Sequence, residues 1–146
     1  MTNVTMHFTL EELYASATAK AKGIDNKPPL QEMINLVYLS AYVLEPLRVA
    51  MKEPITISSG YRCEKLNNAV GGVRNSQHLK GQAADICIDG DMKKGRKWFD
   101  YIKTRLPFDQ LIWEHNKAGV YWIHVSFIYP DFGKNRKNVI DNLLKK

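Results

Sequence analysis

The sequence has little cysteine and no long hydrophobic run. Its two cysteines, Cys63 and Cys87, are too few for the disulfide framework of a small secreted domain, so both are expected to be free thiols. No stretch approaches the roughly 18 apolar residues of a membrane-spanning helix. The N-terminus lacks the basic start and apolar block of a secretory signal. We therefore expect a chain that is made in the cytoplasm and has no membrane partner.

Acidic residues are fewer than basic ones. Fifteen Asp and Glu against 21 Lys and Arg give a net charge of +6, which favours anionic partners without choosing among them. The basic residues are scattered, with local concentrations only at 93–97 and 133–146, and a solvated surface is the ordinary explanation. A nucleic-acid partner is not expected, because no basic and aromatic binding motif is present. A length of 146 residues with 45% hydrophobic residues suits one domain over 1–146 with its own core.

The hydrophobic pattern predicts helices first and strands later. Thr9 to Glu12 forms a capping-box sequence for a first helix, which the turn-forming segment 23–29 ends. A longer helix is expected over about 30–51, kinked or split at Pro46. Strands are expected at 55–58, 84–88, 110–114 and 121–127, and a surface helix at 91–106. This order predicts an α+β fold, with N-terminal helices packed on a small antiparallel sheet.

Three side chains of metal-ligand type lie in or beside the expected strands. His78 precedes the 84–88 strand, Asp85 begins it, and His124 lies in the middle of 121–127. If the two strands are neighbours, two imidazoles and one carboxylate converge, the set of a catalytic zinc that keeps a fourth position open. Taken singly, the three residues have structural explanations, as a loop histidine, a strand cap and a core histidine. Together they predict one Zn²⁺ per chain.

The segment SQHLKGQAAD, residues 76–85, matches the pattern S-x-H-x-x-G-x-A-x-D. With SSGYRCEKLNNAVGG upstream and WIHVSF downstream, it resembles the zinc D-alanyl-D-alanine carboxypeptidases. Relatives of these enzymes include the D-Ala-D-Ala dipeptidases, the phage L-alanoyl-D-glutamate endolysins and the hedgehog signalling domain. FTLEEL and the helices after it resemble the small single-domain branch found in phages and prophages. The resemblance implies zinc on His78, Asp85 and His124, and hydrolysis of peptide bonds in bacterial peptidoglycan.

A zinc peptidase also needs a general base that moves a proton from water to the leaving amine. Many dipeptidase relatives carry it three residues before the last histidine, where this chain has Tyr121, which cannot serve. The hedgehog domain places a glutamate on the preceding strand, and Glu114 resembles that arrangement. Glu114 is therefore the expected base, with a surface carboxylate as its ordinary explanation. His115 is the alternative, because imidazole transfers protons near neutral pH.

Arg62 belongs to the S-x-Y-R block, and the resemblance implies that it holds the substrate and stabilises the oxyanion. A guanidinium suits either role, because it offers a planar fork to a carboxylate or an alkoxide. Ser76 is expected to hydrogen-bond the substrate or its own loop. Tyr61 and Trp122 are expected to wall the site, although aromatic residues beside strands are often part of the core.

Other residues near these motifs are given structural roles. Cys63 lies outside the matched pattern and is not expected to bind zinc. Loop conformations are expected for Asn67, Asn68, Gly71 and Gly72.

The expected protein is a monomeric zinc peptidase of the D-Ala-D-Ala carboxypeptidase type, with a peptidoglycan stem peptide as its substrate. The alternatives are a peptidoglycan endopeptidase and a non-catalytic zinc-containing protein that binds the wall. The choice between the two peptidases depends on whether the cleft is closed at one end. The absence of a signal peptide favours a lysin that is released from inside the cell by a phage or prophage.

Overall fold

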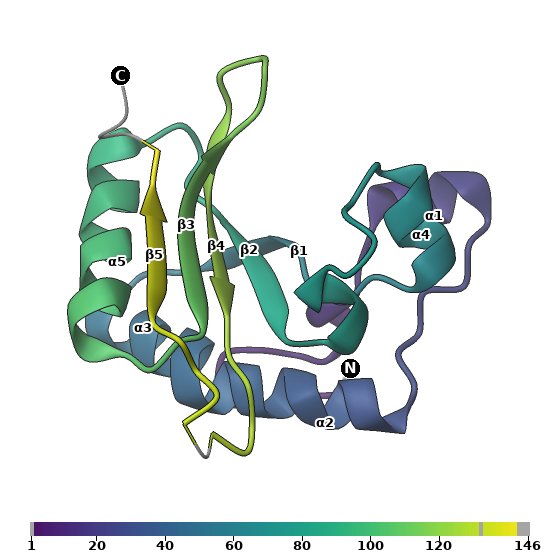
Figure 1. Cartoon of the computed structure of the whole chain (residues 1–146), viewed down its shortest axis with the longest axis horizontal. Helices are drawn as coiled ribbons and strands as arrows, with labels where there is room; N and C mark the ends of the chain where they lie inside the picture. Colours follow the sequence, from purple (N-terminus) through teal and green to yellow (C-terminus); the bar gives the residue numbers. More distant parts are fainter. Residues whose placement is uncertain (1, 132, 143–146) are drawn as a thin grey trace.

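One sheet organises the part of the chain that the computed structural model describes, residues 2–131 and 133–142. Its strand order is β1-β2-β4-β3-β5 (Figure 1). The strands are β1 (Thr56–Ser59), β2 (Ala83–Cys87), β3 (Gln110–His115), β4 (Tyr121–Ser126) and β5 (Asn138–Asp141). The pairs β1–β2, β2–β4 and β3–β4 are antiparallel, and all four of these strands were predicted.

Strand β5 corrects the prediction of a wholly antiparallel sheet. It pairs in parallel with β3, from Gln110 opposite Asn138 to Trp113 opposite Asp141, so the sheet is mixed. In the sequence, this segment is recognisable only as part of a basic tail. Four residues that include Asn and Asp give a weak strand signal, because both residue types are depleted in strands. The α+β class is confirmed.

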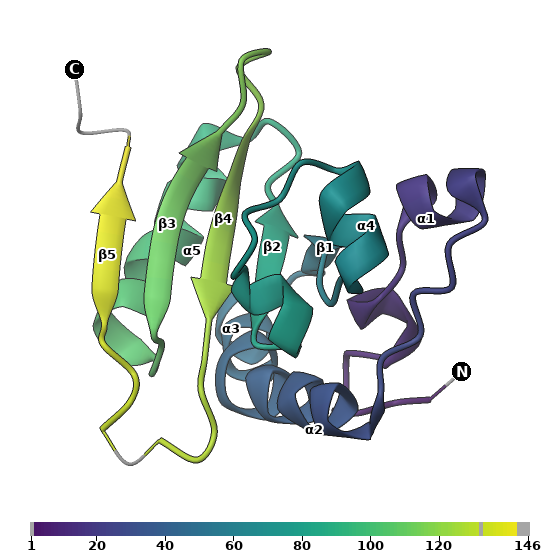
Figure 2. The same cartoon turned by 45° about the vertical axis from the view of Figure 1, so that its right-hand side comes forward.

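The two faces of the sheet have different environments. Helix α5 (Met92–Arg105) covers one face and buries Trp98, Phe99 and Ile102 against it, as predicted (Figures 1 and 2). The fully buried strand residues on this side include Ile86, Leu111, Trp113, Ile123 and Val125. Because side chains alternate along a strand, the residues between them point to the opposite, open face. The turn η3 (Gln77–Lys80) and helix α4 (Glu64–Ala69) stand in front of that face (Figure 2).

The predicted first helix is divided in two. The capping box at Thr9 forms, with the Thr9 amide donating to Glu12 Oε2 at 2.9 Å and the Glu12 amide donating to Thr9 Oγ1 at 3.3 Å. It caps only a 3-10 turn, Glu11–Leu13, and helix α1 (Ala17–Lys22) begins separately. The hydroxyl of Ser16 caps α1 by accepting from the Ala19 amide at 3.1 Å. A second cap signal therefore lay inside the predicted helix.

The predicted long helix is confirmed with its division at the proline. It consists of α2 (Leu30–Leu39), a π-helical turn at Ser40–Leu44 and α3 (Glu45–Met51). Pro46 stands at the start of α3, where a missing amide hydrogen is tolerated best. The widened π turn lies immediately before it, at the point where a regular helix would need that hydrogen.

Helix α4 was not predicted. Asn67 and Asn68 lie inside it, which corrects their assignment to a loop. Cys63 caps its N-terminus, because its Sγ accepts from the Leu66 amide at 3.4 Å. The Asn67 side chain donates to the Val73 carbonyl at 2.8 Å and so closes the turn that follows the helix. Gly71 in that turn has a φ of +73°, as expected for a loop glycine.

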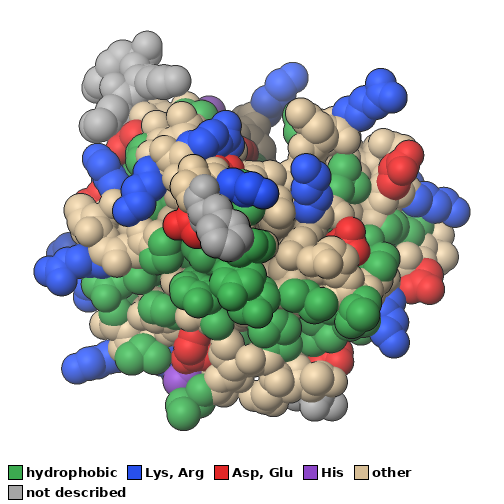
Figure 3. All heavy atoms as spheres, turned by 60° about the horizontal axis from the view of Figure 1, so that its bottom comes forward, with side chains coloured by type: hydrophobic (Ala, Val, Ile, Leu, Met, Phe, Trp, Pro, Cys, Tyr) green, Lys and Arg blue, Asp and Glu red, His purple; other side chains and the backbone are tan. Residues whose placement is uncertain are grey.

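The outer side of α2 carries exposed hydrophobic side chains. Tyr38 stacks on Tyr129 with ring centroids 3.5 Å apart, and Tyr42 lies 5.1 Å from Phe127. Figure 3 shows hydrophobic side chains in a band across this face of the molecule. These contacts fix the segment that follows β4 against the helix. None of the helices in the described residues has the length and apolar composition to cross a membrane.

Candidate metal centre and cleft

Asp85 and His124 face each other across two interior strands. They are directly paired in the β2–β4 register, and both point to the open face of the sheet. His124 Nδ1 lies 3.0 Å from Asp85 Oδ1. The neighbour relation on which the metal prediction depended is therefore present.

His78 reaches the same place from outside the sheet. It lies in the turn η3, is only 3% exposed, and its Nε2 lies 3.3 Å from Asp85 Oδ1. One potential ligand atom each from His78, Asp85 and His124 all lie within 4.8 Å of one another. Ser76 caps the turn by accepting from the His78 amide at 3.1 Å. Gly81 ends it with a φ of +69°, where a side chain would also meet the Glu32 carbonyl oxygen at 2.5 Å.

The other ring nitrogen of His78 fixes its tautomer. Nδ1 lies 2.6 Å from the carbonyl oxygen of Gly60, and a carbonyl only accepts, so Nδ1 carries the hydrogen. In the neutral ring, Nε2 then has a lone pair directed at the Asp85 carboxylate. Two lone-pair atoms at 3.3 Å are favourable only with a proton or a cation between them. A carbonyl behind the ring is also the usual support of a metal-binding histidine.

These three side chains fit a zinc ion. Ligand atoms about 2.0–2.2 Å from a tetrahedral zinc lie about 3.3–3.6 Å apart, near the 3.0 and 3.3 Å found here. Burial raises the pKa of the Asp85 carboxyl, but the adjoining imidazoles of His124 and His78 outweigh burial and hold the pKa well below its usual range. Asp85 is therefore in the ionised form that a metal needs. Neither cysteine belongs to the cluster.

The cluster lies in a cleft of about 910 Å³. Glu114 and Trp122 line the cleft and are directly paired in the β3–β4 register, on the same face as His124. His115 points to the other side of β3, is exposed, and packs its ring 5.1 Å from that of Tyr121. Of the two candidate bases, the structure brings Glu114 and not His115 into the cleft.

Arg62 and Ser76 also line the cleft, whereas Tyr61 does not. The Arg62 amide donates to the His78 carbonyl at 3.0 Å, and its Nη2 donates to Ser76 Oγ at 3.5 Å. Burial lowers the pKa of Arg62, and the charges of Asp85 and Glu114 partly oppose this. Arg62 Nε is buried and has no hydrogen-bond partner among the described residues. Tyr61 is 7% exposed and is part of the hydrophobic core.

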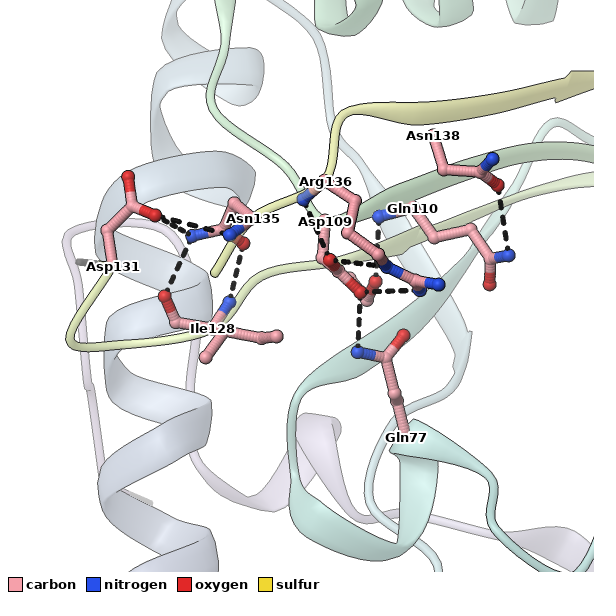
Figure 4. Close-up of polar contacts among 9 residues, drawn as sticks. Gln77, Asp109, Gln110, Ile128, Asp131, Asn135, Arg136 and Asn138 are labelled. Carbon is pink, nitrogen blue, oxygen red and sulfur yellow. Dashed lines mark hydrogen bonds and ion pairs between the residues drawn. The ribbon is translucent and has the colours of Figure 1, made fainter. Parts of the chain in front are cut away.

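Sequence reasoning missed a polar network at another part of the cleft. Asp109 is only 1% exposed and accepts from Arg136 Nε at 3.0 Å and from Arg136 Nη2 at 2.8 Å. It also accepts from Gln77 Nε2 at 2.9 Å (Figure 4). In the sequence, Asp109 resembles a turn residue before a strand and Arg136 resembles a surface cation. No local pattern indicates their pairing.

Comparison with known proteins agrees with the geometry. Residues 6–126 match the Peptidase M15 family, and this range includes the three candidate metal ligands, His78, Asp85 and His124. The zinc D-Ala-D-Ala carboxypeptidase of Streptomyces albus G is 41% identical over 49 residues. That match covers 33% of this chain and 19% of the relative. The resemblance carried by the sequence motifs is confirmed: the chain belongs to the Peptidase M15 family.

Proposed function

We propose that this protein is a zinc peptidase that hydrolyses stem peptides of bacterial peptidoglycan, and that it acts as a D-Ala-D-Ala carboxypeptidase. The observation that carries the proposal is the convergence of His78, Asp85 and His124 in a cleft with Glu114 on the same sheet face. Family membership and the name of the Streptomyces albus G relative support the reaction and the substrate class.

His78, Asp85 and His124 are the residues that would hold the metal. A bound zinc ion supplies an acidified water molecule and polarises the carbonyl of the scissile bond. The protein contributes the orientation of the ligands. Gly60 directs the His78 ring, and the strand register fixes Asp85 opposite His124.

Glu114 is the proposed general base. Its side chain lies on the cleft face of β3, two residues after Ile112, and Ile112 pairs with His124. From there it accepts a proton from the attacking water and returns it to the nitrogen of the leaving amine. Trp122, opposite Glu114, forms the adjoining wall of the cleft.

Arg62 is the proposed substrate-binding cation. Its guanidinium is half-buried, and its Nε lacks a partner among the described residues, so a substrate oxygen would satisfy a donor that is otherwise costly to bury. Ser76 Oγ holds the other end of the fork at 3.5 Å. In a carboxypeptidase, the C-terminal carboxylate of the substrate is the group that fits this fork.

Digestion of purified peptidoglycan, with the released peptides identified by mass, tests the proposal. The zinc-loaded protein should release D-alanine from stem peptides, and the chelator-treated protein and Glu114→Gln should not. A stem peptide with a free C-terminal carboxylate should be cleaved faster than its C-terminal amide. Zinc binding without cleavage of any wall peptide would instead assign the chain to the non-catalytic binding proteins.

Endopeptidase action, of the endolysin type, is the second candidate. The observation that favours it is the extent of the cleft along β3. The lining runs from Glu114, past Ile112 beside the metal set, to Asp109. Substrate residues therefore have room on both sides of the scissile bond. Equal cleavage of the free and amidated peptides would select this candidate over the carboxypeptidase.

A further inference from the structure

Two cations, Lys134 and Arg136, line the cleft at the end of β3 that lies away from Glu114. We propose that they form a second anion-binding subsite, which takes a carboxylate of the substrate at a distance from the scissile bond. The inference rests on the proposed function for the kind of substrate, a peptide, and deepens it. It restricts the preferred substrates to peptides that carry an acidic residue about three positions from the bond that is cleaved.

Arg136 is held in a fixed orientation, and some of its hydrogen-bond donors remain unused by Asp109. Asp109, which is almost fully buried, accepts from Nε and Nη2 of the guanidinium and from the Arg136 amide at 2.9 Å. A guanidinium has five N–H donors, so this side-on pairing leaves Nη1 and one hydrogen of Nη2. The Arg136 side chain is 60% exposed. The donors that remain are thus preorganised for an incoming anion and need little ordering when it binds.

The segment that carries both cations is itself anchored. Asn135, between them, donates from Nδ2 to the Ile128 carbonyl and accepts at Oδ1 from the Ile128 amide, both at 2.9 Å. Its Nδ2 also donates to Asp131 Oδ1 at 3.0 Å (Figure 4). A loop closed by such bonds presents Lys134 and Arg136 at a constant place in the cleft.

The two cations have complementary roles. The charge of Arg136 is largely offset by Asp109, so Arg136 supplies directed donors more than net charge. The side chain of Lys134 forms no ion pair within residues 2–131 and 133–142 and supplies the net positive charge. An anion is therefore attracted by Lys134 and oriented by Arg136.

The sheet register gives the distance of this subsite from the metal set. Ile112 pairs with His124, and Asp109 lies three residues before Ile112, immediately before the first residue of β3. At about 3.3–3.4 Å per residue, that separation is about 10 Å. An extended substrate spans the same distance with about three residues. Arg62 interacts with Asp85 and Glu114, so it serves a different part of the substrate.

The subsite is also linked by hydrogen bonds to the turn that carries His78. Gln77, which precedes His78 in the turn η3, donates to the same Asp109 carboxylate that orients Arg136. One buried carboxylate thus ties the turn of the metal histidine to the anion-binding segment. An anion bound to Arg136 would therefore also help to hold the turn η3 in place, through Asp109 and Gln77.

Binding of a matched peptide pair tests the inference. Both pentapeptides end in D-alanyl-D-alanine, and their second residue is D-glutamate with a free carboxylate in one and a neutral carboxamide in the other. Titration calorimetry uses zinc-loaded Glu114→Gln, which is expected to hold peptide without cleaving it. The acidic peptide should bind at least about tenfold more tightly, since one charged hydrogen-bonded contact distinguishes the two.

Two variants and a matched control locate the preference. In the Glu114→Gln background, Lys134→Gln and Arg136→Lys should each reduce the ratio of the two Kd values by about threefold or more. Arg136→Lys keeps the charge beside Asp109 and so limits any effect on folding. Lys117→Gln, an exposed lysine in the β3–β4 loop that does not line the cleft, should leave the ratio unchanged.

The failure of the subsite and the failure of the proposed function give different results. Equal Kd values for the two peptides, no binding of either, or the same change with Lys117→Gln as with Lys134→Gln would overturn the subsite. Hydrolysis of both peptides by the zinc-loaded wild type would in that case leave the peptidase standing. A tenfold preference that depends on Lys134, with no hydrolysis by the wild type, would support the subsite and reject the peptidase.

Discussion

Gly60 is expected to support metal binding at the candidate metal centre, although it is not one of the candidate ligands. A Cβ at this position would lie 2.0 Å from the carbonyl oxygen of Leu13. Ordinary carbon–oxygen contacts are about 3.3 Å or more, so Gly60→Ala must move one backbone segment by at least about 1.3 Å. We expect the Gly60 segment to shift, which displaces the Gly60 carbonyl that accepts from His78 Nδ1 at 2.6 Å. The bond that directs Nε2 at the metal position is then lost.

The expected size of the effect has two parts. Loss of a supporting hydrogen bond behind a metal histidine typically costs 10–100-fold in metal affinity, or about 1.4–2.7 kcal/mol. The clash also disturbs the bond from the Tyr61 amide to the Leu13 carbonyl, now 2.7 Å. Together with the strain, this should lower the free energy of unfolding of the metal-free protein by about 1–3 kcal/mol. Zinc affinity is measured by competition with a chromophoric chelator, and unfolding by urea titration.

Gly23→Ala is the matched control. Gly23 caps α1 with a φ of +66°, and a Cβ there meets no atom within 4 Å. The left-handed conformation alone should cost about 1–2 kcal/mol of stability, without a change in zinc affinity. A zinc Kd for Gly60→Ala within twofold of the wild type would refute the reasoning. An equal loss of affinity in Gly23→Ala would do so as well, because general destabilisation would then explain both.

Three further predictions concern the cleft. Glu114→Gln should still bind zinc, as measured by elemental analysis, but its kcat should fall by about 10²-fold or more. The kcat of His115→Ala should stay near that of the wild type. The opposite pattern would make His115 the base. Arg62→Lys should lower kcat/KM for peptides with a free C-terminal carboxylate, because a point charge does not replace the bidentate fork; an unchanged value would exclude Arg62 as the binding fork. Burial raises the pKa of Asp109, but the bonds from Arg136 outweigh burial and leave the pKa lowered. Its stabilising contribution is therefore present above the unfolded pKa of about 3.9 and lost as the pH falls through the folded pKa. Urea unfolding should show Asp109→Asn less stable than the wild type at pH 7, with a difference that shrinks below about pH 4; a difference constant with pH would contradict this sign.

Much of the candidate metal centre was predictable because two of its three residues, Asp85 and His124, lie in regular strands. In ADICI and WIHVSF the polar residues Asp85 and His124 alternate with large apolar ones, and this alternation places each of them on the open face. The pairing of the two strands, 39 residues apart for these two side chains, does not follow from periodicity. The metal prediction assumed this pairing, and the resemblance to a known family supported the assumption. In the structure the two strands do pair, with Asp85 opposite His124.

Other parts of the site depend on contacts that leave no local trace. Gly60 is required by a carbonyl of Leu13, far away in the sequence, and nothing in SSGYRC indicates this. Asp109 and Arg136 are 27 residues apart, and each has an ordinary surface explanation when it is taken alone. Tyr61 shows the opposite error. It belongs to a recognisable motif, and its aromatic ring was expected at the site, but burial of that ring places it in the core.

The residues of the site are held in two ways, by the sheet or by a single hydrogen-bond acceptor. Asp85 and His124 lie on β2 and β4, each of which has a hydrogen-bonded neighbour on both sides. Displacement of the backbone at either position requires ladder hydrogen bonds to break, so the sheet itself holds these two positions. His78 and Arg136 lie outside the sheet and are oriented by single acceptors, the Gly60 carbonyl and the Asp109 carboxylate. Substitution of Arg136 should therefore change which peptide is held, whereas substitution of His78 or of the strand positions Asp85 and His124 should change whether a metal is held.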